Sequence, residues 1–171
     1  MQTASKTKAA TKTGEFPARG SDAVEILIND HDVIKGLLSK LVDATTAAAR
    51  KNTLEQLKGI LTIHNATEEN LVYPALSIVA HRRMQAQHLY HETADADLLV
   101  FQLDMMLKKA DDAKFEDLAT EFRDAVLEHI GHEETSAFPQ LKKKAVSQQM
   151  QTLTKDVREF RGKLHMDGEK G

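Results

Sequence analysis

The 171-residue chain contains no cysteine, which excludes disulfide bonds, thiolate zinc sites and cysteine redox chemistry. It has only three prolines, eight glycines and 5% aromatic residues, a composition that favours long helices over a β-sandwich. No apolar run approaches the roughly 18 residues of a membrane span. A formal net charge of −3 argues against nucleic acid as a partner, because a strongly basic domain is then expected. We therefore expect one cytoplasmic globular domain with a substantial core.

Apolar residues recur at alternating steps of three and four through most of the chain, which indicates amphipathic helices. We expect these helices over about residues 22–49, 52–77, 81–109 and 115–144. Because the turns between them are short, the sequence predicts an all-α fold: an antiparallel up-down four-helix bundle over residues 21–145. A further amphipathic C-terminal helix, 146–166, is expected to pack on the bundle or on a partner and to supply no site residue. Residues 1–20 and 167–171 are predicted to be disordered tails.

Two segments of the chain, 64–74 and 129–139, share one pattern: His-x3-Glu-Glu-x3-aromatic-Pro. On a helix, side chains four residues apart lie on the same face, with Cβ atoms roughly 5–6 Å apart. A histidine and a glutamate at that spacing can bind one metal ion or bridge two. Pro74 is expected to kink or end the last turn of its helix.

The other two helices each place one histidine on the apolar stripe. His31 lies on the stripe of the first helix, and in the third helix Met84, His91, Leu98 and Met105 recur every seven residues. Buried carboxylates cost several kcal/mol unless they are paired or bind metal, so their presence on core stripes calls for a partner. The candidate metal ligands are His31, His64, Glu68, His91, His129 and Glu133.

Four imidazoles and two carboxylates can hold two ions about 3.5–4 Å apart, with both carboxylates bridging and positions left open on each ion. Imidazole and carboxylate donors suit iron or manganese, and zinc remains an alternative. His88 is a surface residue, a fifth histidine ligand or a hydrogen-bond donor to a ligand. His132, Glu92 and Glu134 lie beside ligand positions, either on the surface or as hydrogen-bond partners of ligand imidazoles.

These residues resemble the hemerythrin-like (HHE cation-binding) domain family. The resemblance covers about residues 22–144 and rests on Asp30-His31, the segment 64–74, His91-Glu92 and the segment 129–139. It implies a four-helix bundle around two iron ions, Fe2+ or Fe3+, with carboxylate bridges and an oxo or hydroxo bridge.

Departures from the oxygen-carrying members narrow the expected function. Those members have a second histidine where this chain has Gln87, and an aspartate one position beyond that of Glu133. The cysteine segment of the di-iron proteins that repair iron–sulfur clusters has no match either. We expect a monomer or weak homodimer that binds or reacts with peroxide, nitric oxide or dioxygen, with peroxide disproportionation as one version. The alternatives are a non-enzymatic iron- or oxygen-sensing module and a metal ion that only stabilises the bundle.

Overall fold

The computed structural model describes residues 19–168. Of the two predicted disordered tails, residues 1–18 and 169–171 lie outside this range, whereas Asp167 and Gly168 belong to a helix. Within this range, every regular element is helical, which confirms the all-α prediction. The elements are α1 (Ala23–Val42), α2 (Ala47–Thr67), η1 (Glu68–Val72), α3 (Tyr73–Ile78), α4 (Arg83–Lys109), α5 (Asp112–His132), η2 (Glu133–Ala137), α6 (Phe138–Lys144) and α7 (Ser147–Gly168).

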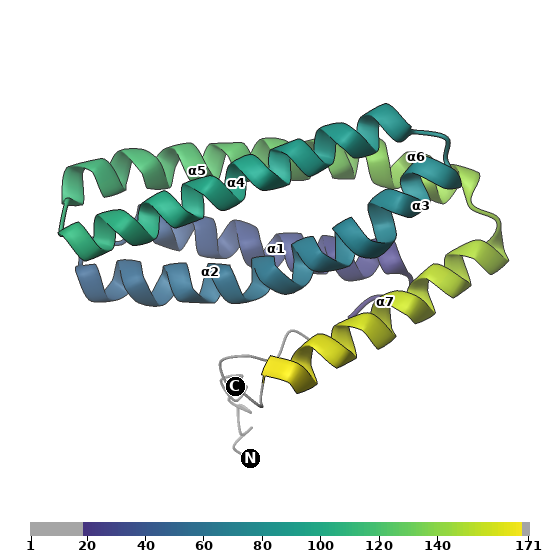
Figure 1. Cartoon of the computed structure of the whole chain (residues 1–171), viewed down its shortest axis with the longest axis horizontal. Helices are drawn as coiled ribbons and strands as arrows, with labels where there is room; N and C mark the ends of the chain where they lie inside the picture. The colour runs from purple at the N-terminus through teal and green to yellow at the C-terminus, as the bar shows by residue number, and fades with distance from the viewer. Residues whose placement is uncertain (1–18, 169–171) are drawn as a thin grey trace, which may run out of the picture.

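The four long helices α1, α2, α4 and α5 lie lengthwise beside one another (Figure 1). Contacts join α1 to α2, α2 to α4, α4 to α5 and α5 to α1, so the four helices surround a common interior. The short helices α3 and α6 continue the rods of α2 and α5 at one end of the bundle. None of the helices between residues 19 and 168 combines the length and the apolar character needed to cross a lipid bilayer.

Helix starts are fixed by side-chain caps. Asp22 caps α1 by accepting a 3.0 Å hydrogen bond from the backbone N–H of Glu25. The second helix begins at Ala47 instead of near residue 52, because Thr46 caps it and its side-chain oxygen accepts a hydrogen bond from the N–H of Ala49. The first helix consequently ends at Val42 instead of near residue 49.

Two apolar clusters fill the interior at different levels along the bundle. One contains Leu27 and the aromatic rings of Tyr73 and Phe138, and the other contains Ile34 and the ring of Phe122. His31 lies between Leu27 and Ile34 on α1, so the polar centre described below separates two fully apolar layers. This arrangement excludes bulk water from the centre on both sides.

The rotation of α4 differs from the prediction. Its buried residues are Ala86, Leu89, Thr93 and Leu103. On the predicted stripe, by contrast, Met84 is 77% exposed and Leu98 56% exposed. Residues two apart on a helix point about 200° apart, so Thr93 takes the inward direction that the periodicity predicts for His91.

The C-terminal helix α7 packs against α1, α2 and η1, and it runs to Gly168, slightly beyond the predicted end. Of the two expected alternatives, packing on the bundle or on a partner, the structure shows packing on the bundle (Figure 1). Within residues 147–164 of α7, three side chains are buried: Thr154, Val157 and Arg161. The hydroxyl of Thr154 accepts a 3.0 Å hydrogen bond from the N–H of Ala23, which fixes α7 to the start of α1.

Candidate metal centre

The two repeated segments each contain one π-helical turn, η1 and η2, which begins at the glutamate of the His-x3-Glu pair. In each turn the aromatic N–H donates five residues back, from Tyr73 to the Glu68 carbonyl and from Phe138 to the Glu133 carbonyl. Proline follows each aromatic residue, and in an α-helix its ring would clash with the carbonyl four residues earlier. The wider turn relieves this clash, so Pro74 does not end its rod, which bends between α2 and α3 (Figure 1). It also turns both aromatic side chains into the interior, where both are buried.

Four ligand atoms converge in the interior. The Nε2 atom of His31 lies 3.2 Å from Oε2 of Glu133, and Nε2 of His64 lies 3.2 Å from Oε1 of Glu68. All four residues are buried, and one ligand atom from each lies within 4.8 Å of every other. Three of these atoms have no hydrogen-bond donor in the structure: His31 Nε2, Glu68 Oε1 and Glu133 Oε2.

The opposite nitrogen of each of these imidazoles faces a carboxylate. His31 Nδ1 lies 2.8 Å from Oε1 of Glu134, which also accepts a hydrogen bond from the Lys35 ammonium at 2.8 Å. His64 Nδ1 lies 3.3 Å from Oδ2 of Asp30. A carboxylate can only accept, so the proton of each neutral ring is on Nδ1 and the lone pair of Nε2 points into the centre. Such a carboxylate–imidazole pair is the usual way in which a metal-binding histidine is oriented.

This proton assignment brings acceptors face to face. A lone pair on His31 Nε2 meets a lone pair on Glu133 Oε2, and the same holds for His64 Nε2 and Glu68 Oε1. Acceptors left unsatisfied in a buried place cost about 1–3 kcal/mol each. A cation between them satisfies all four atoms at once. The donor set of two imidazoles and two carboxylates therefore fits a divalent metal ion.

Arg161 of α7 holds Asp30, the carboxylate that faces His64. Its guanidinium donates to both oxygens of Asp30, at 2.6 and 3.1 Å, and both side chains are buried. Although burial opposes ionisation, the hydrogen bonds from His64 and Arg161 lower the pKa of Asp30. The Asp30 carboxylate thus stays charged and holds the His64 ring in place.

The other half of the centre has a tyrosine where a further histidine was expected. The hydroxyl of Tyr73 lies 3.0 Å from Oε2 of Glu68, 2.9 Å from Oε1 of Glu133 and 3.2 Å from Nε2 of His129. His129 Nε2 is itself 3.6 Å from Glu133 Oε1, and its Nδ1 faces Oε2 of Glu92 at 3.0 Å. Tyr73 and His129 therefore meet the outer oxygens of the same two carboxylates whose inner oxygens face His31 and His64.

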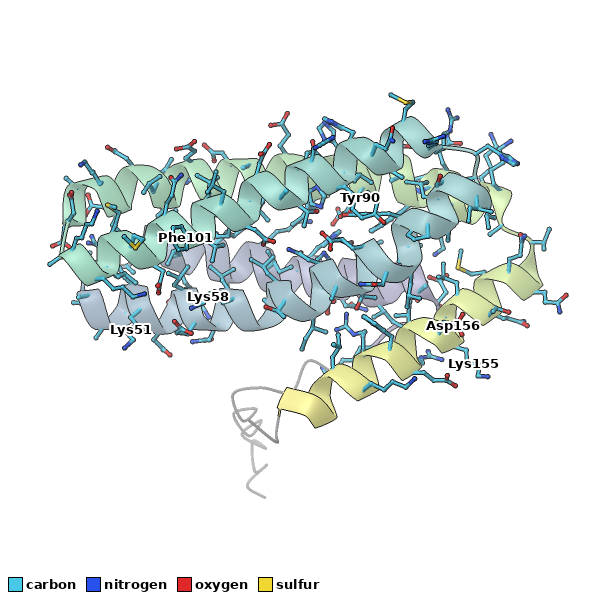
Figure 2. The ribbon with its side chains drawn as sticks, viewed as in Figure 1. Lys51, Lys58, Tyr90, Phe101, Lys155 and Asp156 are labelled. Atoms are coloured by element: carbon cyan, nitrogen blue, oxygen red, sulfur yellow. The ribbon has the colours of Figure 1, made fainter. Side chains whose placement is uncertain are left out.

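A second tyrosine covers Tyr73. The rings of Tyr73 and Tyr90 are 5.0 Å apart and nearly perpendicular, and the Tyr90 hydroxyl donates to the backbone carbonyl of Glu69 at 2.6 Å. Figure 2 shows Tyr90 between α4 and the rod of α2 and α3. The phenol of Tyr73 is thereby held in one orientation toward the carboxylates.

The inward placement predicted for His91 is wrong. His91 is exposed on α4 and is not among the residues that converge, whereas His31, His64, Glu68, His129 and Glu133 are all buried. The error has a physical cause. Helix α4 has apolar residues on two faces, and its packing partners select the face with the smaller side chains, Ala86 and Thr93 among them.

The two buried glutamates differ in their electrostatics. Burial and the adjacent charge of Glu133 raise the pKa of Glu68 well above its usual value. Burial also acts on Glu133, but the contact with the His31 imidazole and the nearby His129 and His64 outweigh it and lower the pKa of Glu133. Burial and both carboxylates raise the pKa of Tyr73.

A small cavity of about 20 Å³ lies against His64 and His129, with Thr93 and Asp97 also in its wall. This volume holds about one water molecule. A larger groove of about 500 Å³ between α2 and α4 shares Asn65 and Asp97 with it and opens to the surface. The centre is thus adjacent to a space that admits molecules of one or two heavy atoms.

Several residues that shape the centre were not predicted to do so. Arg161 was missed because it stands alone in an amphipathic helix, 131 residues from its partner Asp30. The role of Tyr73 had a visible signal, since the repeat has tyrosine at one aromatic position and phenylalanine at the other. Glu92 and Glu134 pair with the imidazoles of His129 and His31, which is one of the two alternatives that the sequence predicts for them.

A helical bundle with a buried, solvent-excluded set of histidines and carboxylates defines a cation-binding protein. In agreement, the family model "Hemerythrin HHE cation binding domain" matches residues 22–141, and the chain belongs to this family. Helix α7 lies outside the matched region, although it supplies Arg161.

Among curated proteins, the chain is similar to a DNA nickase of Nostoc sp. (strain PCC 7120), with 22% identity over 156 residues. The match covers 88% of this chain but only 44% of that protein. The chain thus spans less than half the length of this relative.

Proposed function

We propose that this protein binds iron within an up-down bundle and reacts with small oxidants, with peroxide as the leading substrate and nitric oxide and dioxygen as further ligands. The observation that carries the proposal is the set of facing acceptor atoms of His31, His64, Glu68 and Glu133 in a place closed to bulk water. Iron would supply electrons and open coordination positions there.

The ligand set that we propose is asymmetric. One ion would be held by the four converging residues, and a second by His129 and Tyr73 together with the outer oxygens of Glu68 and Glu133. His91 has no part in it. Glu68 and Glu133 would then bridge the two ions, as the sequence predicts, but tyrosine replaces the fourth histidine.

The residues of the chain set what can reach the centre. The adjacent cavity of about 20 Å³ admits molecules the size of water, peroxide or a diatomic gas and excludes larger substrates. His31, His64 and His129 each have Nδ1 hydrogen-bonded to a carboxylate, so they act as fixed donors and not as acid–base groups. The apolar layers on both sides limit escape of reactive products.

The test is the rate of peroxide loss and oxygen release by the full chain after loading with Fe2+ and removal of free iron. We expect turnover in the parent and loss of at least about tenfold in His64→Ala and Glu68→Ala, because ligand-shell changes typically cost 10–100-fold. His91→Gln is the matched control, since it changes an exposed histidine of the same bundle. Equal peroxide consumption by the parent and both site variants would overturn the enzymatic proposal.

A non-enzymatic sensing function is the second candidate, and one contact favours it. Arg161 connects α7, which lies outside the family domain, to Asp30 and so to His64. Iron binding at His64 would then stabilise the docking of α7. Hydrogen exchange of α7 with and without iron tests this: slower exchange with iron and no peroxide turnover would support sensing, and unchanged exchange would contradict it.

The relative's nicking activity is not part of this proposal. The match leaves more than half of that protein uncovered, and a net charge of −3 disfavours a polyanionic partner. Incubation of the iron-loaded chain with supercoiled plasmid checks this point, and we expect no relaxed product.

A further inference from the structure

A second group of metal-binding side chains lies outside the buried centre, on the surface where α4 meets the end of α5. It consists of His88 and Glu92 of α4 and His132 of α5, and one ligand atom from each lies within 4.8 Å of the others. His88 Nε2 is 3.0 Å and His132 Nδ1 is 2.6 Å from the same atom, Oε1 of Glu92. We call this group the surface triad.

The surface triad is open to solvent. The side chains of His88 and His132 are 60% and 42% exposed, whereas that of Glu92 is 17% exposed. The two imidazole rings have centroids 5.4 Å apart at 49°, so both rings direct a nitrogen to one point beside the carboxylate. An ion bound there would keep several positions for water.

The donor types select the class of ion. Two imidazoles and one carboxylate form a set typical of Fe2+ and also suit Zn2+, Ni2+ and Cu2+. Mg2+ and Ca2+ prefer oxygen donors and would gain little from the two ring nitrogens. The triad lacks thiolates, which excludes selection for soft monovalent ions.

Glu92 joins the surface triad to the buried centre. While its Oε1 faces His88 and His132, its Oε2 faces Nδ1 of His129 at 3.0 Å. The other two converging imidazoles are held by Glu134 and Asp30, which pair with Lys35 and Arg161. Of the three imidazoles, His129 differs from His31 and His64 in one respect. Its carboxylate partner, Glu92, contacts two further histidines and not a lysine or an arginine.

We propose that the surface triad binds one divalent transition-metal ion per chain, with Glu92 shared between this ion and His129. The ion would pair with Glu92 as Lys35 pairs with Glu134 and as Arg161 pairs with Asp30. It would fix Glu92 and, through it, the ring of His129. The proposal does not depend on the identity or the reactivity of the metal in the buried centre.

The test is equilibrium dialysis of the chelator-stripped full chain against Zn2+, with bound zinc measured by mass spectrometry. We expect His88→Gln and His132→Gln to bind one zinc ion fewer per chain than the parent, with the affinity of that site weakened at least about tenfold. His91→Gln is the matched control, because His91 is exposed on the same helix next to Glu92, and it should bind as the parent does. Excess Mg2+ should not displace the ion.

Thermal unfolding of each metal-free variant checks that it folds, and the exposure of both histidines makes large losses unexpected. Unchanged zinc stoichiometry in both His88→Gln and His132→Gln would overturn the proposal and leave only a hydrogen-bonded cluster. Loss of all zinc in these variants would also contradict it, because the buried centre should keep its ions. A failure of peroxide turnover in the parent would bear on the buried centre and not on this site.

Discussion

The aromatic residue of the first repeat is Tyr73, and that of the second repeat is Phe138. The Tyr73 hydroxyl contacts Glu68, Glu133 and His129, whereas the Phe138 ring stacks on His31 with centroids 5.7 Å apart and planes 10° apart. The two segments share the His-x3-Glu-Glu pattern, the π-helical turn and the proline. They differ at the aromatic position in one hydroxyl group.

The helices opposite the repeats differ as well. Helix α1 directs His31 into the interior, but α4 directs Leu89 and Thr93 there. The tyrosine hydroxyl stands where α4 provides no imidazole. A duplicated ligand motif therefore does not ensure a symmetric metal centre. The remaining ligands must come from α1 and α4, and the rotation of each of these helices decides which of its side chains points inward.

The largest expected difference between the two halves is in metal binding. His64→Ala removes one of four converging donors and should lower the metal affinity of the buried centre at least about tenfold, while His129→Ala should leave one ion tightly bound in that centre. Metal content after dialysis against limiting Fe2+ measures both. Equal losses in the two variants would show that the halves are equivalent.

Arg161→Met removes the guanidinium that donates to both oxygens of Asp30, next to His64. Removing one partner of a buried ion pair leaves the other charge uncompensated and costs about 3–5 kcal/mol, so we expect a loss near the lower limit in urea unfolding. Arg158→Met is the matched control on the same helix, since Arg158 is exposed and contacts only the Gly20 carbonyl among the hydrogen bonds described. Similar losses in both variants would contradict a special role of Arg161.

Glu68→Gln should stabilise the metal-free protein while abolishing tight metal binding. The pKa of Glu68 is raised in the folded state, so its contribution to stability is full below its usual pKa of 4.5 and is lost as the pH rises through the raised value. The free energy of unfolding of the variant should therefore increase relative to that of the parent as the pH rises from 4 to 7. Urea unfolding in chelator at pH 4 and pH 7 measures this difference. A gain that does not grow with pH would contradict the electrostatic account.

Tyr73→Phe makes the aromatic positions of the two repeats identical. Loss of the hydroxyl removes a buried hydrogen bond, worth about 1 kcal/mol in the metal-free protein. It should also weaken the second ion and leave the first in place. Tyr90→Phe, which changes the other tyrosine of the chain, should leave metal content unchanged. A tyrosine-independent stoichiometry would exclude Tyr73 as a donor.

His91→Gln is expected to have the smallest effect. An exposed side chain without a role in the core changes stability by no more than about 0.5 kcal/mol. Metal content and peroxide turnover should equal those of the parent. A loss of metal in this variant would instead support the ligand set predicted from the sequence, in which each of the four long helices supplies one histidine.

The strongly periodic helices could be predicted well. On α1, α2 and α5 the apolar stripe is unambiguous, so a histidine or glutamate on it must point inward, as His31, His64, Glu68, His129 and Glu133 do. The C-terminal helix was predicted from the same kind of pattern, but its buried Arg161 could not be assigned a partner. No local pattern connects an arginine to an aspartate 131 residues away.

By itself, the sequence determined the helices, the repeat and five inward polar residues, because periodicity within a helix fixes which side chains share a face. Only the tertiary structure decided that Leu89 and Thr93 of α4 face the centre, that Tyr73 meets both carboxylates and that Arg161 holds Asp30. The physical reason is that the rotation of a helix about its own axis is set by packing against all of its neighbours at once. When two faces of one helix are apolar, that packing and not the local pattern selects the buried face.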